Sequence, residues 1–220
     1  MNNDVKTLIE KIKNQYNNID TILLFGSALN ADWTNQSDID IFLIDDSFND
    51  SRSEIEIDGV VIEFQEDKFS NITKDMENER GRLLNRNVST MIATSEIIST
   101  KSPEKVENLI NLAKEILASP SKYDDEDIKM WKYSIEDYLA KAEKDIARND
   151  EIAFYFDAHY VLQNALEMSL ATNSLYMPQP KYLDKLLAEN DPELQRIWKN
   201  YLSADSMSEK LNALKPLSNR

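Results

Sequence analysis

The pattern of apolar and polar positions divides the chain into two parts of different character. In the first hundred residues, apolar β-prone runs alternate with helical periodicity, whereas the rest of the chain is helical almost throughout. The expected strands are residues 21–25, 38–44 and 95–100, with two more around an Asp58-Gly59 turn within residues 54–64. The expected helices are residues 3–18, 28–33, 69–93, 103–119, 124–148 and 151–175, with two shorter ones after Pro180. The pattern predicts an α+β chain, in which a small mixed-sheet domain (residues 1–102) precedes an antiparallel helical bundle (residues 103–220).

A Gly-Ser pair follows the first expected strand. Gly26 is one of only three glycines in the chain, and it comes directly after the apolar run of residues 21–25. A glycine allows a sharp turn and lets backbone N–H groups approach an anion, and Ser27 adds a hydroxyl. By itself the pair is more typical of an ordinary turn than of a phosphate site.

Two carboxylates begin the next expected strand. In residues 38–44, Asp38 and Asp40 alternate with Ile39 and Ile41, so both acids project from one face of the strand. Two carboxylates on one face repel each other unless a cation or a proton lies between them. The pair therefore indicates a divalent metal site, and Mg²⁺ prefers such hard oxygen ligands.

Glu63 is a candidate for a third acid. It lies between Ile62 and Phe64 in the second strand of the expected hairpin, so it projects away from the apolar face. An ordinary solvent-facing position explains it equally well in isolation. Beside the upstream motif, a third metal ligand or a base is favoured.

Gly26-Ser27, Asp38-x-Asp40 and Glu63 resemble the Gly-Ser, Asp-x-Asp and third-acid pattern of the nucleotidyltransferase superfamily related to DNA polymerase β. The resemblance is closest to its small prokaryotic members, among them the antibiotic (aminoglycoside) nucleotidyltransferases. It covers residues 20–66, and the rest of the chain is similar only in architecture. Glu63 stands where Asp is common in the family, although it still supplies a hard oxygen. The resemblance implies a nucleotidyltransferase catalytic domain followed by a helical substrate-binding domain.

The resemblance also implies a reaction. A nucleoside monophosphate, with AMP as the expected group, passes from ATP or another nucleoside triphosphate to a hydroxyl of a small molecule, and pyrophosphate is released. Two Mg²⁺ ions are expected on Asp38 and Asp40, with Glu63 holding the hydroxyl-side ion or accepting the proton. Gly26 and Ser27 are expected at the β- and γ-phosphates.

Charge and composition bear on the partner and the compartment. The net charge is -15, which disfavours long nucleic acid and favours a cationic acceptor such as an aminoglycoside, although acidic surfaces also serve solubility. The absence of cysteine excludes a disulfide framework and a thiolate metal site. Residues 1–6 lack the features of a signal peptide and no apolar run has the length of a membrane span, so a cytoplasmic location is expected. Both a monomer and a homodimer remain open.

Two further groups of residues are candidates for the site. Arg80, Arg82 and Arg86 lie in the expected helix 69–93, where they suit phosphate contacts or equally surface ion pairs with neighbouring glutamates. In the expected helix 151–175, one face carries Asp157, Tyr160 and Glu167. These three are candidates for the acceptor side, since the resemblance implies that a carboxylate of the helical domain can deprotonate the acceptor hydroxyl.

Two alternative functions remain open at this point. The first is nucleotidyl transfer to a protein or a tRNA, as in toxin–antitoxin relatives, and the acidity of the chain argues against tRNA. The second is a non-catalytic nucleotide-binding module, and the presence of all three acids argues against it.

Overall fold

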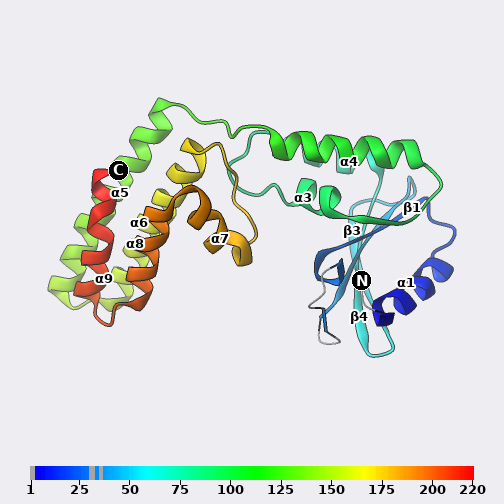
Figure 1. Cartoon of the computed structure of the whole chain (residues 1–220), viewed down its shortest axis with the longest axis horizontal. Coiled ribbons are helices and arrows are strands. Elements are labelled where there is room, and N and C mark those ends of the chain that lie inside the picture. Colours follow the sequence, from blue (N-terminus) through cyan, green and yellow to red (C-terminus); the bar gives the residue numbers. More distant parts are fainter. Residues whose placement is uncertain (1–2, 30–32, 35–36) are drawn as a thin grey trace. The chain divides into compact units, whose positions relative to one another are not determined.

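The computed structural model of the chain describes residues 3–29, 33–34 and 37–220. It falls into two compact units, which are treated separately. Unit 1 comprises Met1–Arg80 and Arg86–Ser119, and unit 2 comprises Gly81–Asn85 and Pro120–Arg220. Figure 1 follows the elements along the chain. The expected α+β class is confirmed, with a mixed sheet followed by a helical region.

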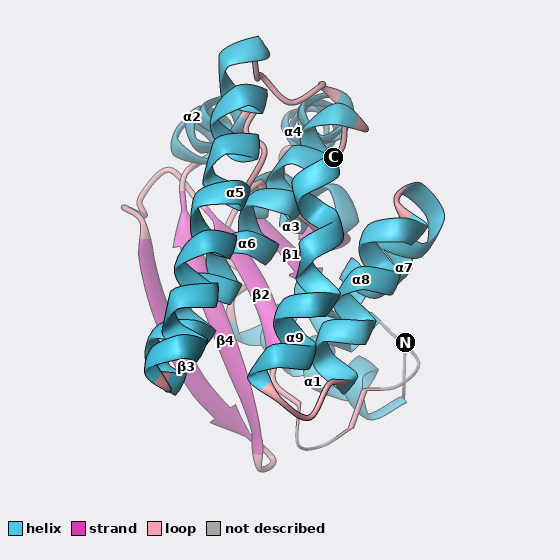
Figure 2. Ribbon diagram, turned by 90° about the vertical axis from the view of Figure 1, so that its left-hand side faces the viewer, coloured by secondary structure: helices cyan, strands magenta, loops and turns pink. Residues whose placement is uncertain are grey.

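The sheet of unit 1 has five strands in the order β3-β4-β2-β1-β5. The strands are β1 (Thr21–Phe25), β2 (Ile39–Ile44), β3 (Ser51–Ile57), β4 (Val60–Asp67) and β5 (Glu96–Thr100). Strand β2 pairs in parallel with β4, while the other neighbours are antiparallel. Figure 2 shows β3, β4, β2 and β1 across the sheet. The expected Asp58-Gly59 hairpin joins β3 to β4, and both turn residues have positive φ, as a tight hairpin turn requires.

Helices cover the two faces of this sheet through separate apolar clusters. On one face, α1 (Asn3–Gln15) packs with alternate residues of β2 and β4, such as Ile41 and Ile62. On the other face, Phe42 and Ile44 pack with α2 (Phe69–Glu79), α3 (Asn87–Thr94) and α4 (Pro103–Ala118). Helices α3 and α4 lie side by side (Figure 1). Because Asp40 lies between Ile39 and Ile41, it shares the face of Phe42.

The expected single helix over residues 69–93 is wrong, because the structure has two helices with a break at residues 80–86. The break is stabilised by buried polar groups. Glu79 is 5% exposed and accepts hydrogen bonds from the N–H groups of Val88 and Ser89 at the start of α3, each at 2.8 Å. Gly81 has a φ of 76°, a conformation that ends a helix.

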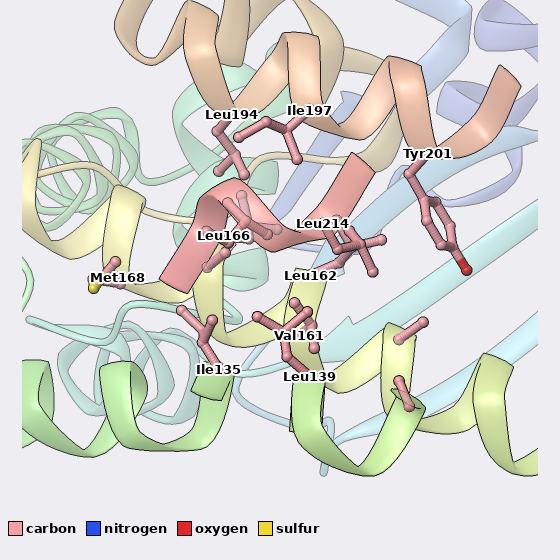
Figure 3. Packing of buried hydrophobic residues seen from close by; sticks show 14 of the residues in the cluster. Ile135, Leu139, Val161, Leu162, Leu166, Met168, Leu194, Ile197, Tyr201 and Leu214 are labelled. Atoms are coloured by element: carbon pink, nitrogen blue, oxygen red, sulfur yellow. The ribbon is translucent and has the colours of Figure 1, made fainter. Parts of the chain in front are cut away.

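Unit 2 is a helical bundle built on α5 (Asp125–Arg148) and α6 (Glu151–Thr172). The two helices are antiparallel, since Trp131 contacts Glu167 while Tyr138 stacks on Tyr160. Their core also takes side chains from α8 (Pro192–Ser203) and α9 (Met207–Leu214), with Leu194 and Leu214 fully buried (Figure 3). The expected antiparallel pairing of the long helices is therefore confirmed.

The end of the chain contains more helices than expected. Instead of two short helices after Pro180, the described residues form α7 (Pro180–Asn190), α8 and α9, followed by a 3-10 turn at Lys215–Asn219. Side-chain caps separate these helices. Asp191 accepts from the N–H of Leu194 at the start of α8, and Ser206 forms a capping box with Glu209 at the start of α9.

The boundary between the two units is close to the expected one without coinciding with it. Helix α4 belongs to unit 1, because Val106, Leu109 and Ala113 are buried against α2, α3 and the sheet. The expected division after residue 102 therefore falls inside unit 1. That residues 1–102 serve catalysis and residues 103–220 serve substrate binding stays a prediction. None of the helices in the described part of the chain is long and apolar enough to cross a membrane.

Candidate active site

Three carboxylates converge where β2 begins. Asp38, Asp40 and Glu63 each offer an oxygen, and these oxygens lie within 4.8 Å of one another. The convergence follows from the parallel pairing of β2 with β4, in which Asp40 is the register partner of Glu63. Oxygens that share one Mg²⁺ stand about 3–4 Å apart, so these three carboxylates would need only small side-chain rotations to hold one such ion together. The donor set fits Mg²⁺ or another hard divalent cation.

Gly26 brings the backbone against one of these acids. It follows β1, which pairs with β2 so that Phe25 lies opposite Asp40. Gly26 has a φ of 77°, and a Cβ atom placed there would lie 2.0 Å from Asp40 Oδ2. Only glycine allows this contact, because any side chain would displace the carboxylate. The glycine turn and the aspartate that the sequence predicts as a metal ligand therefore lie directly against each other.

Ser27 contributes a hydroxyl that no group of the described chain satisfies. Its Oγ atom is screened from solvent and has no hydrogen-bond partner among the described residues. An unsatisfied buried hydroxyl costs about 1–3 kcal/mol, so a ligand that accepts its hydrogen bond gains that amount. Ser27 belongs to a 3-10 turn at Gly26–Leu29. Of the helix expected at residues 28–33, residues 30–32 lie outside the described residues.

Trp33 also supports the site, a role that the sequence did not indicate. Its ring is 6% exposed and packs in the cluster beneath α1. Its indole Nε1–H donates to the main-chain oxygen of Asp38 at 3.2 Å. This contact holds the backbone just before β2 and thereby orients the Asp38 side chain. A lone tryptophan in a loop gives no sequence signal for such a contact.

The three arginines have different surroundings. Arg80 forms ion pairs with Glu77 (2.7 Å) and Glu115 (2.9 Å), and these hydrogen bonds raise its pKa. Arg82 is exposed and belongs to unit 2. Arg86 is 2% exposed and donates to the carbonyls of Ile116 and Ser119, so it stabilises the end of α4. Phosphate binding by Arg80 and Arg82 stays a prediction.

The acceptor-side candidates on α6 all contact α5. Tyr160 stacks on Tyr138 with ring centroids 4.7 Å apart, and Glu167 accepts from Trp131 Nε1 at 3.2 Å. Asp157 lies against Asp145, which is 1% exposed and whose Oδ1 pairs with Arg148. The Oδ2 atom of Asp145 accepts no hydrogen bond from a described N–H or hydroxyl group, and a protonated Asp157 carboxyl is a group that can donate to Asp145. Asp157, Tyr160 and Glu167 remain candidates for the acceptor side, and no contact in unit 2 tests that role.

The contact between the Asp145 and Asp157 carboxyls should make the stability of the folded protein depend on pH. Burial, followed by the hydrogen bond and the charge of Asp145, raises the pKa of Asp157, and Lys141 opposes this shift. The folded protein thus holds a proton that the unfolded chain has released, so the free energy of unfolding falls as the pH rises through the raised pKa. An Asp157→Asn variant keeps a donor toward Asp145 at every pH. We expect urea unfolding to show it more stable than wild type near pH 8, and to show a smaller difference near pH 4.

A matched control for this prediction is Glu151→Gln, which removes one exposed acid from the first turn of the same helix. This variant should follow the pH profile of the wild-type protein. If Asp157→Asn follows the wild-type profile too, the two carboxyls do not share a proton.

Most of unit 1 is similar to a known protein family. Residues 6–104 match the family model described as polymerase beta, nucleotidyltransferase. A solved structure, that of a nucleotidyltransferase-like protein from Exiguobacterium sibiricum 255-15, is similar with a TM-score of 0.54. The alignment covers 96% of this chain and 72% of that chain at 14% identity, so it shows the fold alone. The comparison with curated proteins gives no match.

The family match and the site coincide, since Gly26, Ser27, Asp38, Asp40 and Glu63 all lie within the matched residues. The divalent cation that such domains use has a suitable set of carboxylates here. The fold, the acids and the family model agree. Residues 6–104 of this chain therefore form a nucleotidyltransferase domain of the polymerase beta family.

Proposed function

We propose that the protein is a Mg²⁺-dependent nucleotidyltransferase that moves a nucleoside monophosphate, with AMP as the expected group, from a nucleoside triphosphate to a hydroxyl of a small molecule. The observation that carries the proposal is the convergence of Asp38, Asp40 and Glu63, with the Gly26 turn against Asp40. Phosphate groups and hard cations are bound by this combination of a tight glycine turn and carboxylates. The completeness of the acid set opposes a non-catalytic role.

The residues of the site have distinct parts in this reaction. Asp38, Asp40 and Glu63 would hold the divalent cation, which when bound offsets the negative charge on the phosphates and lowers the pKa of the attacking hydroxyl. The turn at Gly26 lets the phosphates approach the backbone, and the Ser27 hydroxyl donates to a phosphate oxygen. Together they orient the α-phosphate for in-line attack.

The proposed reaction is a single displacement at the α-phosphorus. The acceptor oxygen forms a bond to the α-phosphorus as the bond between the α-phosphorus and the bridging oxygen to the β-phosphate breaks. Pyrophosphate leaves with the electron pair of that bond. The proton of the hydroxyl passes to a carboxylate of the cluster or to water.

A cationic small molecule is the acceptor class that we propose, with an aminoglycoside-type antibiotic as the compound to test first. The support is electrostatic, because a chain of net charge -15 attracts cations and repels tRNA. Among the described residues of unit 1, no feature favours a macromolecular acceptor over this one.

The experiment that tests the proposal measures pyrophosphate. The full chain is incubated with Mg²⁺, each of the four nucleoside triphosphates and a panel of amine-bearing and neutral polyols. We expect acceptor-dependent pyrophosphate release that stops when EDTA removes the cation and returns when Mg²⁺ is restored. A small-molecule acceptor is excluded if labelled ATP marks only the protein itself, and nucleotidyl transfer is excluded if no acceptor, including the protein, yields pyrophosphate.

A further inference from the structure

Five residues between α2 and α3 belong to unit 2, although the helices on either side of them belong to unit 1. These residues are Gly81–Asn85, which we call the strap. The strap begins and ends in the left-handed conformation, since Gly81 has a φ of 76° and Asn85 has a φ of 60°. Glycine and asparagine are the residues that adopt this conformation most easily. The sequence is therefore suited to turning the chain at both ends of the strap.

The main chain of the strap is hydrogen-bonded to two loops of unit 2. The N–H of Lys122, just before α5, donates to the carbonyl of Gly81 at 2.7 Å. The N–H of Met177, in the connection between α6 and α7, donates to the carbonyl of Leu83 at 2.9 Å. The strap thus supplies acceptors to the loops that precede α5 and follow α6.

Side chains of the strap and of these loops also pack together. Leu83 is partly buried against the apolar cluster of unit 2, as is Leu175 in the connection between α6 and α7. The buried Ser121 joins the two loops directly, because its hydroxyl donates to the carbonyl of Leu175 at 2.7 Å. A Cβ atom placed on Gly81 would lie 2.7 Å from Lys122 Cγ. The strap therefore lies closely against unit 2 along its length.

Unit 1 fixes the chain on both sides of the strap. Before it, the buried Glu79 carboxylate accepts from the N–H groups of Val88 and Ser89, so it closes the break between α2 and α3. After it, the buried Arg86 guanidinium donates to the carbonyl of Ser119 at 2.8 Å. Fixed ends favour the docking of the strap, because less conformational freedom is lost when it binds to unit 2.

We propose that the strap couples the break between α2 and α3 to the connection between α6 and α7. A disturbance at the break loosens the ends of the strap, and the hydrogen bond from Met177 to Leu83 then opens more often. Such coupling is carried by contiguous hydrogen bonds and packed side chains, which are present here within each unit. The nucleotidyltransferase domain thereby acts on the end of α6, the helix that carries the acceptor-side candidates. The inference does not depend on the proposed function.

Hydrogen exchange of single amides, measured by NMR on the full chain, tests this coupling. Glu79→Gln leaves one acceptor oxygen where there were two, so an N–H at the start of α3 loses its partner. We expect the Val88 amide to exchange at least about tenfold faster, and the Met177 amide at least about threefold faster. The Leu194 amide donates to Asp191 in a buried part of unit 2 away from these loops, and it should keep the wild-type rate.

Two further variants complete the test. Asp75→Asn is the matched control, since Asp75 is an exposed carboxylate on the same helix as Glu79, and all these amides should exchange at the wild-type rate. Leu83→Ala weakens the packing of the strap and leaves its carbonyl in place. The Met177 amide should then exchange at least about tenfold faster, while the Leu194 amide is unchanged.

Four results would overturn the inference. The first is faster exchange at Val88 in Glu79→Gln without any change at Met177, because the disturbance then stops at the break. The second is wild-type exchange at Val88 in this variant, since Glu79 then does not hold the break. The third is wild-type exchange at Met177 in Leu83→Ala. The fourth is an equal acceleration at Leu194 and Met177, which indicates global unfolding. None of these measurements involves pyrophosphate release, so failure of the proposed function leaves the inference standing.

Discussion

Replacement of Asp40 by Asn is expected to lower the rate of pyrophosphate release by at least about 10³-fold, equivalent to about 4 kcal/mol of transition-state stabilisation. Asp40 is central to the acid group, because it pairs in register with Glu63 and contacts the Gly26 turn. The amide keeps the shape of the side chain and removes its charge. The cation would then have two carboxylates instead of three. Titration of the protein with Mn²⁺, followed by electron paramagnetic resonance, should show a weaker site in parallel.

Asp46→Asn is the control for this prediction. Asp46 is an exposed aspartate just beyond the other end of β2, so its replacement removes the same charge from the same unit without touching the site. It should leave the rate and the Mn²⁺ affinity close to those of the wild-type protein. Equal activity of Asp40→Asn and Asp46→Asn would remove Asp40 from the catalytic machinery and with it the metal-dependent mechanism.

Much of unit 1 was predictable because local patterns and tertiary contacts agree there. The run at β1 is apolar after Thr21 and is buried by helices on both faces, and the alternation in β2 places Ile39 and Ile41 against α1. The Asp58-Gly59 turn requires positive φ at both positions and fixes the β3–β4 hairpin locally. Each of these features is a property of a few consecutive residues.

The features that the sequence did not predict depend on distant groups. The break between α2 and α3 is stabilised by Glu79 and by Arg86, whose partners Ile116 and Ser119 lie about thirty residues away in sequence. Helical periodicity continues across the break, although Gly81 is a local signal for the end of a helix. The extra helix at the end of the chain was detectable, since Ser206 and Glu209 have the spacing of a capping box.

The candidate site was predictable in its residues but not in its geometry. Alternation indicated that Asp40 and Glu63 project from apolar strands, yet only the parallel pairing of β2 with β4 makes them register partners. Parallel pairing joins strands that are distant in sequence, and no local signal specifies its register. The bond from Trp33 to Asp38 also has no local sequence signal. The residue types in the sequence therefore indicate which chemistry the site can perform, whereas the pairing of the strands decides which of these residues lie close together.

Replacement of Gly26 by Ala should abolish most activity while leaving a folded protein. The new Cβ would lie 2.0 Å from Asp40 Oδ2, so the carboxylate or the turn must move by more than 1 Å. A displacement of that size at a catalytic group costs about 10²-fold in rate. The positive φ of 77° adds about 1–2 kcal/mol of backbone strain for an L residue. Gly59→Ala separates the two effects, since Gly59 has a φ of 80° and nothing within 4 Å of the added Cβ. Both variants should melt at lower temperature than the wild-type protein, but only Gly26→Ala should lose pyrophosphate release and Mn²⁺ affinity. If Gly26→Ala keeps its activity, or if Gly59→Ala loses as much, the close approach of the turn to Asp40 has no part in catalysis.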